Sequence, residues 1–294
     1  MDWKLSLGGL LVGVLVGATG MGGGSLLTPL LVLVFGFNPT VAVGTDLFHG
    51  AIFKSVGALR HRRIGTVQAR LSGWMFLGSA PMSLAGVAVA TLLQHHWSHA
   101  VKWQEVVIGV ALVIGAIGTV LKALIRFREH PDAPFVMTRR DKLAAFAIGF
   151  IGGFIVGLTS VGSGVFFGLT MLIVFPLRSA KVVGTDIFHG AALLWVAGTG
   201  HLVAGNVDMR AVGSLLVGSI PGVLLGSGLT LRLPDRMLRL TLGAVLLVSG
   251  IKLLNVPYTV PLMGVSLAAL AVAAYLALRT PAAGERTRPA TPVT

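Results

Sequence analysis

The sequence has no cysteine and few acidic residues. Among its 294 residues, 10 are Asp or Glu, and charged residues of both signs make up 11%. The absence of cysteine excludes disulfides, thiolate chemistry and cysteine metal sites. Hydrophobic residues make up 54% of the chain, in uncharged runs that are far too long for the core of a globular protein. We therefore predict an all-α polytopic membrane protein.

Catalytic motifs are also missing. The chain contains no Walker motif, no nucleophile elbow and no metalloprotease helix, so we expect no enzyme activity and no cofactor. The net charge of +13 would suit nucleic acid in a soluble protein. Here the basic residues cluster between hydrophobic runs and at the C-terminal end, where they act as topology signals. We therefore expect membrane lipid as a partner and no nucleic acid.

An internal repeat organises the chain. The segment GTDLFHG at 44–50 recurs as GTDIFHG at 184–190. A constant offset of 140 aligns residues 17–86 with 157–226 without a gap, and 25 of these 70 positions are identical. The chain is therefore two copies of one unit, and a pseudo-symmetric site is predicted.

Nine hydrophobic segments follow one another along the chain. They run at about 5–35, 41–59, 71–93, 103–125, 143–175, 182–200, 211–231, 237–254 and 257–278. Seven suit a single crossing of a bilayer, but the first and the fifth are much too long. Each of these two is either one tilted, kinked helix or two short helices that enter and leave on one side.

Loop charges favour the second arrangement. If all nine segments cross, the two sides of the membrane receive 13 and 9 Lys or Arg residues. If the first and fifth are re-entrant hairpins and the N-terminus is outside, the counts become 18 inside and 4 outside. The positive-inside rule prefers this layout, which turns the second unit upside down relative to the first. We predict inverted repeats in the bacterial cytoplasmic membrane, with the N-terminus outside and the C-terminus inside.

Each unit is then a glycine-broken re-entrant helical hairpin followed by three transmembrane helices. The first unit covers residues 5–126, the second covers 143–255, and one extra helix follows at 257–278. Because the units share an interface in the membrane, we expect one transporter domain over residues 1–280. The Pro/Thr-rich tail at 281–294 is predicted to be disordered.

The two glycine-rich stretches are candidate binding elements. Irregular backbone within a membrane must face protein or a water-filled cavity, and a helix that starts after the break would point N–H groups at an anion. The alternative is tight helix packing through small residues. The candidate residues are Thr19, Gly22, Gly24 and Ser25 in the first copy and Thr159, Gly162, Ser163 and Gly164 in the second.

Two aspartates lie in the apolar sequence that follows. An ionisable group inside a membrane segment costs about 2.5–3.5 kcal/mol and is a functional-site candidate by default. A histidine three residues later lies on the same helical face and could relay a proton. Alternatively, each aspartate caps the helix that begins beside it and each histidine joins a local network; a metal site has little support from the spacing. The candidates are Thr45, Asp46, His49, Thr185, Asp186 and His189.

Lys54 is the lysine that lies well inside an apolar segment, and Leu194 replaces it in the second copy. Three roles are open: it neutralises an anion, it pairs with Asp46, or it reaches toward the basic residues at 60–70.

These motifs resemble the TauE/SafE sulfite exporter family of membrane permeases, which includes 4-toluene sulfonate uptake permease-like proteins. The resemblance rests on GATGMGGGSLLTPLL at 17–31 with AVGT at 42–45, and on GLTSVGSGVFFGLTM at 157–171 with VVGT at 182–185. It covers about residues 5–254. Asp46 and Asp186 stand where many relatives place Ser, which allows a changed substrate.

The resemblance implies transport of sulfur-containing oxyanions or organosulfonates. We therefore expect a secondary transporter for a small anion, such as sulfite, an organosulfonate or a related organic anion, by alternating access at the repeat interface. A proton is the candidate coupling ion, and a homo-oligomer is open. The alternatives are a channel, a cation or metal carrier that uses Asp46 and Asp186, and a non-transporting membrane scaffold.

Overall fold

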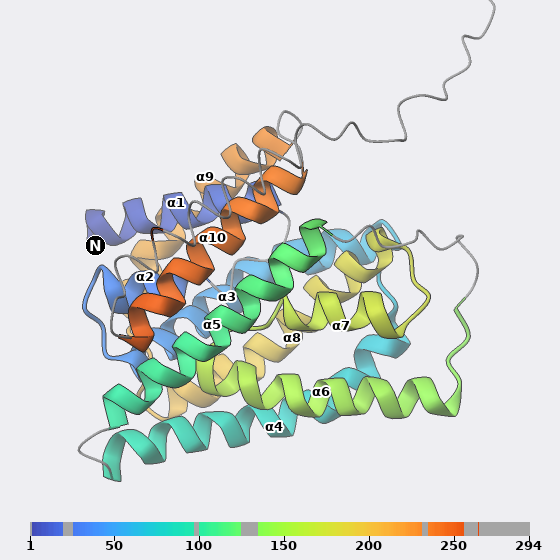
Figure 1. Ribbon diagram of the computed structural model, residues 1–294, viewed down its shortest axis with the longest axis horizontal. Coiled ribbons are helices and arrows are strands. Elements are labelled where there is room, and N and C mark those ends of the chain that lie inside the picture. The colour runs from blue at the N-terminus through green and yellow to red at the C-terminus, as the bar shows by residue number, and fades with distance from the viewer. Residues whose placement is uncertain are drawn as a thin grey trace, which may run out of the picture.

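A computed structural model describes residues 2–19, 26–96, 100–124, 135–230, 235–255 and 264. These residues form ten helices and no strand (Figure 1), so the prediction of an all-α protein is confirmed. The helices are α1 Trp3–Thr19, α2 Leu27–Leu33, α3 Pro39–Arg63, α4 Ala69–His96, α5 Ala100–Leu124, α6 Arg139–Thr159, α7 Phe166–Val174, α8 Ser179–Val203, α9 Met209–Thr230 and α10 Asp235–Leu254.

Six of the described helices are long and apolar enough to cross a membrane, namely α4, α5, α6, α8, α9 and α10. α3 has 25 residues, but its charged and polar side chains lower its hydropathy. The chain is therefore a multi-pass membrane protein. The predicted extra helix at 257–278 and the predicted tail at 281–294 lie outside the described residues.

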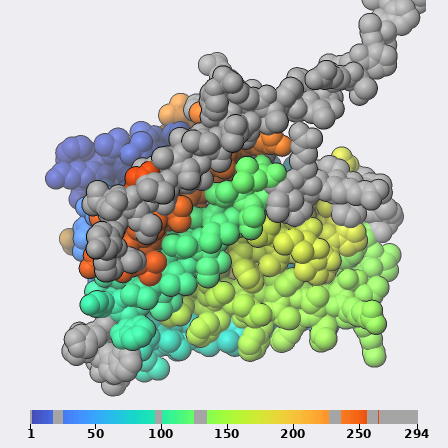
Figure 2. Space-filling model, in the orientation of Figure 1, coloured from blue at the N-terminus to red at the C-terminus, as the bar shows by residue number. Residues whose placement is uncertain are grey.

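Helices of the first unit pack mainly on helices of the second. α1 lies along α9, α4 lies along α6, α3 packs on α8, and α5 packs on α10. In Figure 1 the α1–α9 pair and the α4–α6 pair lie at opposite edges of the molecule, with α3 and α8 between them. Figure 2 shows α5 and α10 side by side across the face toward the viewer.

Glycines allow the closest of these helix contacts. A β-carbon at Gly13 of α1 would collide with the backbone of Ser219 in α9, and one at Gly153 of α6 would collide with the backbone of Ser79 in α4. The two pairs are related by the repeat, because Gly153 is the counterpart of Gly13 and Ser219 is the counterpart of Ser79 at the offset of 140. The two units therefore make the same contact in reciprocal directions, through small residues that let backbones approach closely.

α3 and α8 run antiparallel. Along α3, the residues Phe48, Gly50 and Gly57 lie close to Gly198, Leu194 and Ile187 of α8, respectively. Residue numbers rise along one helix while they fall along the other. Since α8 is the copy of α3 in the second unit, this central pair is a helix packed against its own duplicate in the opposite direction.

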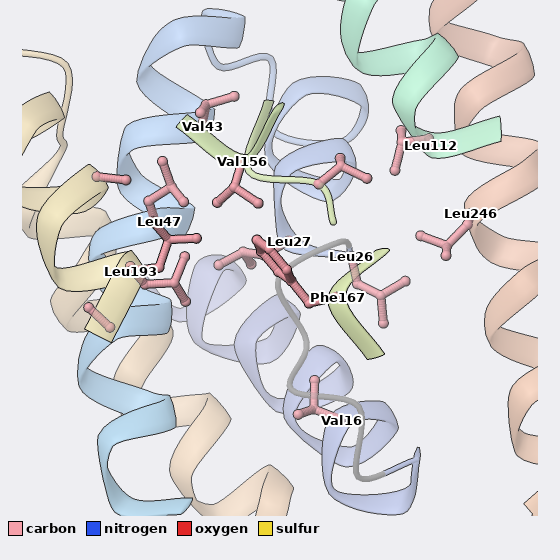
Figure 3. Close-up of a cluster of buried hydrophobic side chains, with 14 of the residues drawn as sticks. Val16, Leu26, Leu27, Val43, Leu47, Leu112, Val156, Phe167, Leu193 and Leu246 are labelled. Carbon is pink, nitrogen blue, oxygen red and sulfur yellow. The ribbon is translucent and has the colours of Figure 1, made fainter. Parts of the chain in front are cut away.

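A buried apolar cluster joins the two units. Leu27 at the start of α2 and Phe167 at the start of α7 are counterparts in the repeat, and both are fully buried. Figure 3 shows their side chains in one cluster with Leu47 of α3 and Leu193 of α8. The starts of the two short helices therefore lie in the interior of the molecule, where they position the polar residues next to them.

Candidate functional site

The break in the second unit separates α6 from α7. Three residues between these helices have positive φ angles, namely Ser160 at 60°, Gly162 at 118° and Gly164 at 147°. At φ values of 118° and 147° a β-carbon is strained, so glycine is required at both positions. The predicted break at Gly162 to Gly164 is confirmed. In the first unit α1 ends at Thr19 and α2 begins at Leu27; Gly22, Gly24 and Ser25 lie between them, outside the described residues, and the structure does not describe the side chain of Thr19.

Both broken segments turn back on themselves. The ring of Phe167 in α7 lies against Gly152 of α6, and the rings of Phe135 and Phe175, which flank the two helices, lie 6.0 Å apart. In the first unit, the ring of Phe35 after α2 lies next to Gly8 of α1. Each segment is therefore two helices in a hairpin, which decides against one long kinked helix.

Asp46 is buried, with 2% of its surface exposed, and its Oδ2 atom accepts three hydrogen bonds. The donors are Thr28 N at 3.2 Å, Thr28 Oγ1 at 2.6 Å and Ser160 Oγ at 2.9 Å. Thr28 belongs to α2 and Ser160 to the break of the second unit. Asp46 thus ties the two broken segments together.

The expected capping role of the aspartates is corrected. α3 begins at Pro39, where the side chain of Asn38 accepts the N–H of Thr40, so Asp46 lies inside the helix. Asp186 likewise lies inside α8, which begins at Ser179. The two helices begin further upstream than we expected, because the helical backbone continues beyond the apolar segments at 41–59 and 182–200, to Pro39 and Ser179. Asp46 binds the N-terminus of a different helix, α2.

Lys54 is buried at 4% exposure and points toward the second unit. Its Nζ donates to Ser163 O at 2.7 Å and to Ser163 Oγ at 2.9 Å. The expected alternative, in which Lys54 reaches toward residues 60–70, is wrong because the side chain is held in the interior. A positive charge therefore lies directly at the second glycine break.

Asp186 is buried at 7% exposure. Its Oδ1 atom has no hydrogen-bond partner among the described residues. A β-carbon at Gly168 of α7 would lie 3.6 Å from Asp186 Oδ2 and 3.1 Å from Nζ of Lys122 in α5. Asp186 therefore faces α7 and a lysine, without the hydroxyl donors that surround Asp46.

The two histidines bind serines of the other unit. His49 Nε2 lies 2.9 Å from Ser219 Oγ in α9, and His189 Nε2 lies 3.4 Å from Ser79 Oγ in α4. Within the described part of the chain, neither histidine is hydrogen-bonded to the aspartate three residues before it. The hypothesis of a direct Asp–His pair is therefore wrong, because each ring is directed across the interface between the units.

Three of the four threonines of the predicted site, all but Thr19, form hydrogen bonds with backbone groups. Thr45 Oγ1 accepts from Asp208 N at 3.1 Å, and its counterpart Thr185 Oγ1 accepts from Gln68 N at 2.9 Å. Thr159 Oγ1 donates to Ile155 O at 2.7 Å and accepts from Val161 N at 3.1 Å. Thr45 thus fixes the start of α9, and Thr185 fixes the start of α4, so each threonine acts on a helix of the other unit. Thr159 fixes the end of α6.

A family model with the description "Sulfite exporter TauE/SafE" matches residues 5–253 of the chain. This range covers the described helices from near the start of α1 almost to the end of α10. The chain belongs to the TauE/SafE family. The resemblance seen in the two glycine-rich motifs is therefore confirmed.

Curated relatives agree with the family assignment. "Probable membrane transporter protein YjnA" of Bacillus subtilis is 38% identical over 255 residues, which cover 86% of this chain and 100% of the relative. YunE of the same species and MJ0441 of Methanocaldococcus jannaschii, also named probable membrane transporter proteins, are each 25% identical, over 84% of this chain and 94% and 92% of their own lengths. No solved structure matches the chain. These names indicate a membrane transporter and agree with the expectation that the chain is no enzyme.

Several residues of this TauE/SafE protein were missed in the sequence. Ser79 and Ser219 are identical in the two copies, and this identity was a signal that could have found them. Thr28 and Ser160 gave no such signal, because their counterparts are Gly168 and Gly20. Lys122 lies at the end of an apolar segment and looks like an ordinary topology signal.

The site offers little to a metal ion. Among the residues that the structure describes, no group of three or more His, Cys, Asp or Glu side chains comes together. Serine, threonine and lysine groups surround the carboxylates instead. The donor set is therefore rich in N–H and O–H groups, which suit an anion.

A largely apolar cavity of about 340 Å³ lies between α5, α6 and α7. Ile114 and Gly118 of α5 and Phe154 of α6 line it, and Thr159 and Gly162 lie at the second glycine break. Gly162 is next to Ser163, the residue that holds Lys54. The cavity therefore reaches the edge of the polar centre.

Proposed function

We propose that this TauE/SafE protein is a secondary transporter that moves a small anion, namely sulfite, an organosulfonate or a related organic anion. The observation that carries the proposal is the buried ammonium group of Lys54 at the second glycine break. Taking a charge out of water costs several kcal/mol unless a partner compensates, so a lysine kept inside an apolar protein is a functional candidate. Lysine has three N–H donors, and Ser163 accepts two of them.

The backbone around the break supports an anion site. α7 begins at Phe166 and has 9 residues, and the first N–H groups of a helix carry a partial positive charge. The N–H groups of Gly164, Phe166 and Phe167 already donate to Gly162 O, whereas the hydroxyl of Ser163, which accepts from Lys54 Nζ, can still donate its O–H to an anion. We propose Lys54, Ser163 and the positive end of α7, with Gly162, Gly164 and Asp186, as the substrate site.

We infer further that the two units are inverted repeats that move against each other. The antiparallel α3 and α8, together with reciprocal contacts such as Gly13–Ser219 and Gly153–Ser79, support this arrangement. In transporters of this type, broken helices meet near the middle of the bilayer at the repeat interface. The loop charges favour a layout with the N-terminus outside and the C-terminus inside. For an anion that crosses without a coupled ion, a membrane potential that is negative inside favours export, by about 2.3 kcal/mol per charge at 100 mV.

Counterflow in proteoliposomes tests the proposal. The purified protein is reconstituted, and exchange is measured for labelled sulfite, methanesulfonate and acetate. Lys54→Leu introduces the residue that stands at the matching position 194 of the second copy. We expect the wild type to exchange at least one of these anions and Lys54→Leu to exchange it at least about tenfold more slowly, equivalent to a loss of about 1.4 kcal/mol.

Lys252→Leu is the matched control, because Lys252 is an exposed lysine near the end of α10. We expect this variant to exchange the anion at the wild-type rate. Counterflow of sodium or a divalent cation with no anion exchange would replace the proposal by a cation carrier. Absence of any flux from correctly folded protein would favour the scaffold.

A further inference from the structure

The repeat gives the two aspartates different surroundings. In the first unit, the hydroxyl groups of Thr28 and Ser160 both donate to Asp46. The offset of 140 places Gly168 and Gly20 at the matching positions for Asp186. Both hydroxyl donors have therefore been replaced by glycine in the second constellation.

The loss of donors leaves a buried carboxylate oxygen without a hydrogen bond. Asp186 Oδ1 has no partner among the described residues, although 7% of the side chain is exposed. Buried polar atoms are nearly always satisfied, and an exception calls for an explanation such as a bound ligand or a catalytic role. Asp46, which is also buried and whose Oδ2 accepts three hydrogen bonds, provides the internal comparison.

The charged groups that act on Asp186 come from two other helices. They are Lys54 of α3 and Lys122 of α5. α7 contains no ionisable residue and faces Asp186 with Gly168. α6 has charged residues only in its first turn. The ionisable residues of α4 lie at its two ends, namely Arg70, His95 and His96.

The remaining ionisable neighbour lies on α8 itself, because His189 follows Asp186 by three residues. Its ring packs edge-on against Phe167 at 4.7 Å and faces Ser79. The charges of Lys54 and Lys122 therefore both act on Asp186, and Lys54 is also subject to the charge of Asp46.

We propose that Asp186 binds and releases a proton that is carried together with the anion, whereas Asp46 keeps a fixed structural role. The coupling to an anion rests on the proposed function, whereas the proton site at Asp186 does not depend on it. It assigns the coupling ion to one of the two duplicated aspartates. The assignment follows from the missing hydroxyl donors, from the unsatisfied Oδ1 atom, and from the two lysines whose charges act on Asp186.

The step is a simple proton transfer. A proton from water adds to Asp186 Oδ1 and converts the carboxylate into a neutral carboxylic acid, with no redox change. The ionised carboxylate competes with a substrate anion for Lys54 and Lys122, and protonation ends this competition. One proton and one monovalent anion then cross together, and deprotonation on the far side restores the carboxylate–lysine attraction, which expels the anion. Acid conditions therefore strengthen anion binding.

Infrared difference spectroscopy on the purified protein tests the proton site without any substrate. Spectra recorded across a pH series show the C=O band of a carboxyl group that becomes protonated. We expect this band from the buried carboxyl in the wild type and in Asp46→Asn, and its loss in Asp186→Asn. Persistence of the band in folded Asp186→Asn, or its loss in folded Asp46→Asn, would overturn the assignment. If Asp186→Asn does not fold, Asp186→Ser serves as the second variant.

Anion affinity as a function of pH tests the coupling. The probe is methanesulfonate, which stays ionised at every pH used, and binding is measured by thermal stabilisation. In the wild type we expect affinity to rise about tenfold for each unit that the pH falls, the limit for one coupled proton. In Asp186→Asn we expect affinity that does not change with pH. A pH dependence that Asp186→Asn retains would contradict the coupling.

The two experiments separate the proposals. If no anion binds or crosses but the infrared band is lost in Asp186→Asn, the anion function fails and the proton site stands. If anions bind and cross but the infrared band survives in Asp186→Asn, the proton site fails and the anion function stands. A flux that requires sodium at constant pH would also overturn the proton assignment.

Discussion

The helix contacts of the two units are equivalent, whereas the surroundings of their two aspartates are not. Gly13 meets Ser219 as Gly153 meets Ser79, and His49 lies beside Ser219 as His189 lies beside Ser79. Asp46 accepts three hydrogen bonds, but Asp186 leaves Oδ1 unsatisfied in the described structure.

This difference shows which parts of a duplicated structure were free to diverge. The contacts between helices occur twice, with the roles of the two units exchanged. A change in one unit that breaks a contact therefore also breaks the match between the two interfaces. The polar centre has no such constraint, since Asp46, Ser160 and Lys54 interact across the two breaks. In the second unit, Gly168 stands at the position that matches Thr28 and Leu194 at the position that matches Lys54. Asp46 therefore remains a structural link between the broken segments, whereas Asp186 is free to take another role.

The largest effect is expected at the close helix contacts, where the units are equivalent. Gly13→Leu and Gly153→Leu both place a side chain against the backbone of a facing helix. Overpacking typically costs about 1–3 kcal/mol and occasionally more, and a collision with backbone puts both variants at the upper end of that range. We expect both variants to lose folded protein to the same degree, as measured by size-exclusion chromatography of a fluorescent fusion.

The control for these variants is a second pair of repeat-related glycines. Gly73 and Gly213 have open space where a β-carbon would lie, so Gly73→Ala and Gly213→Ala should give wild-type amounts of folded protein. Strong loss in only one of Gly13→Leu and Gly153→Leu would show that the helix contacts are less equivalent than the structure indicates.

A smaller effect is expected at the aspartates, where the units differ. Asp46→Asn keeps an amide oxygen that can still accept, so the three hydrogen bonds to Oδ2 are weakened and not lost, and we expect a loss of about 2 kcal/mol in all. We expect a clearly lower thermal unfolding midpoint in detergent for Asp46→Asn and a smaller decrease for Asp186→Asn, because the latter removes a poorly hydrogen-bonded buried charge but also a counter-charge of Lys54 and Lys122. Equal losses of stability in the two variants would remove the distinction between the aspartates.

Much of the fold could be predicted from the sequence. The long hydrophobic runs identify an all-α membrane protein, and the constant offset of 140 reveals the duplication. The break at Gly162 to Gly164 could be predicted because two glycines stand where positive φ angles are needed. These features are local or repeated, so they leave a pattern in the chain.

The polar centre was harder to predict. Asp46 was correctly singled out, but its partners Thr28 and Ser160 come from different broken segments and have glycine counterparts, so no repeat marks them. The direction of Lys54 depends on how α3 packs against the second unit, a contact between residues 109 positions apart. Helix capping by Asp46 and Asp186 was wrong because the helix starts depend on residues upstream of the apolar segments.

The central claim is that the two units face opposite sides of the membrane around one shared polar centre. Because the chain has no cysteine, single cysteines can be introduced without background. Arg63 and Val203 are counterparts at the exposed ends of α3 and α8, so Arg63→Cys and Val203→Cys form a matched pair for labelling with a membrane-impermeant maleimide in intact cells. We predict that Val203→Cys reacts from outside and that Arg63→Cys reacts only after the membrane is opened; labelling of both from the same side would contradict the inverted arrangement.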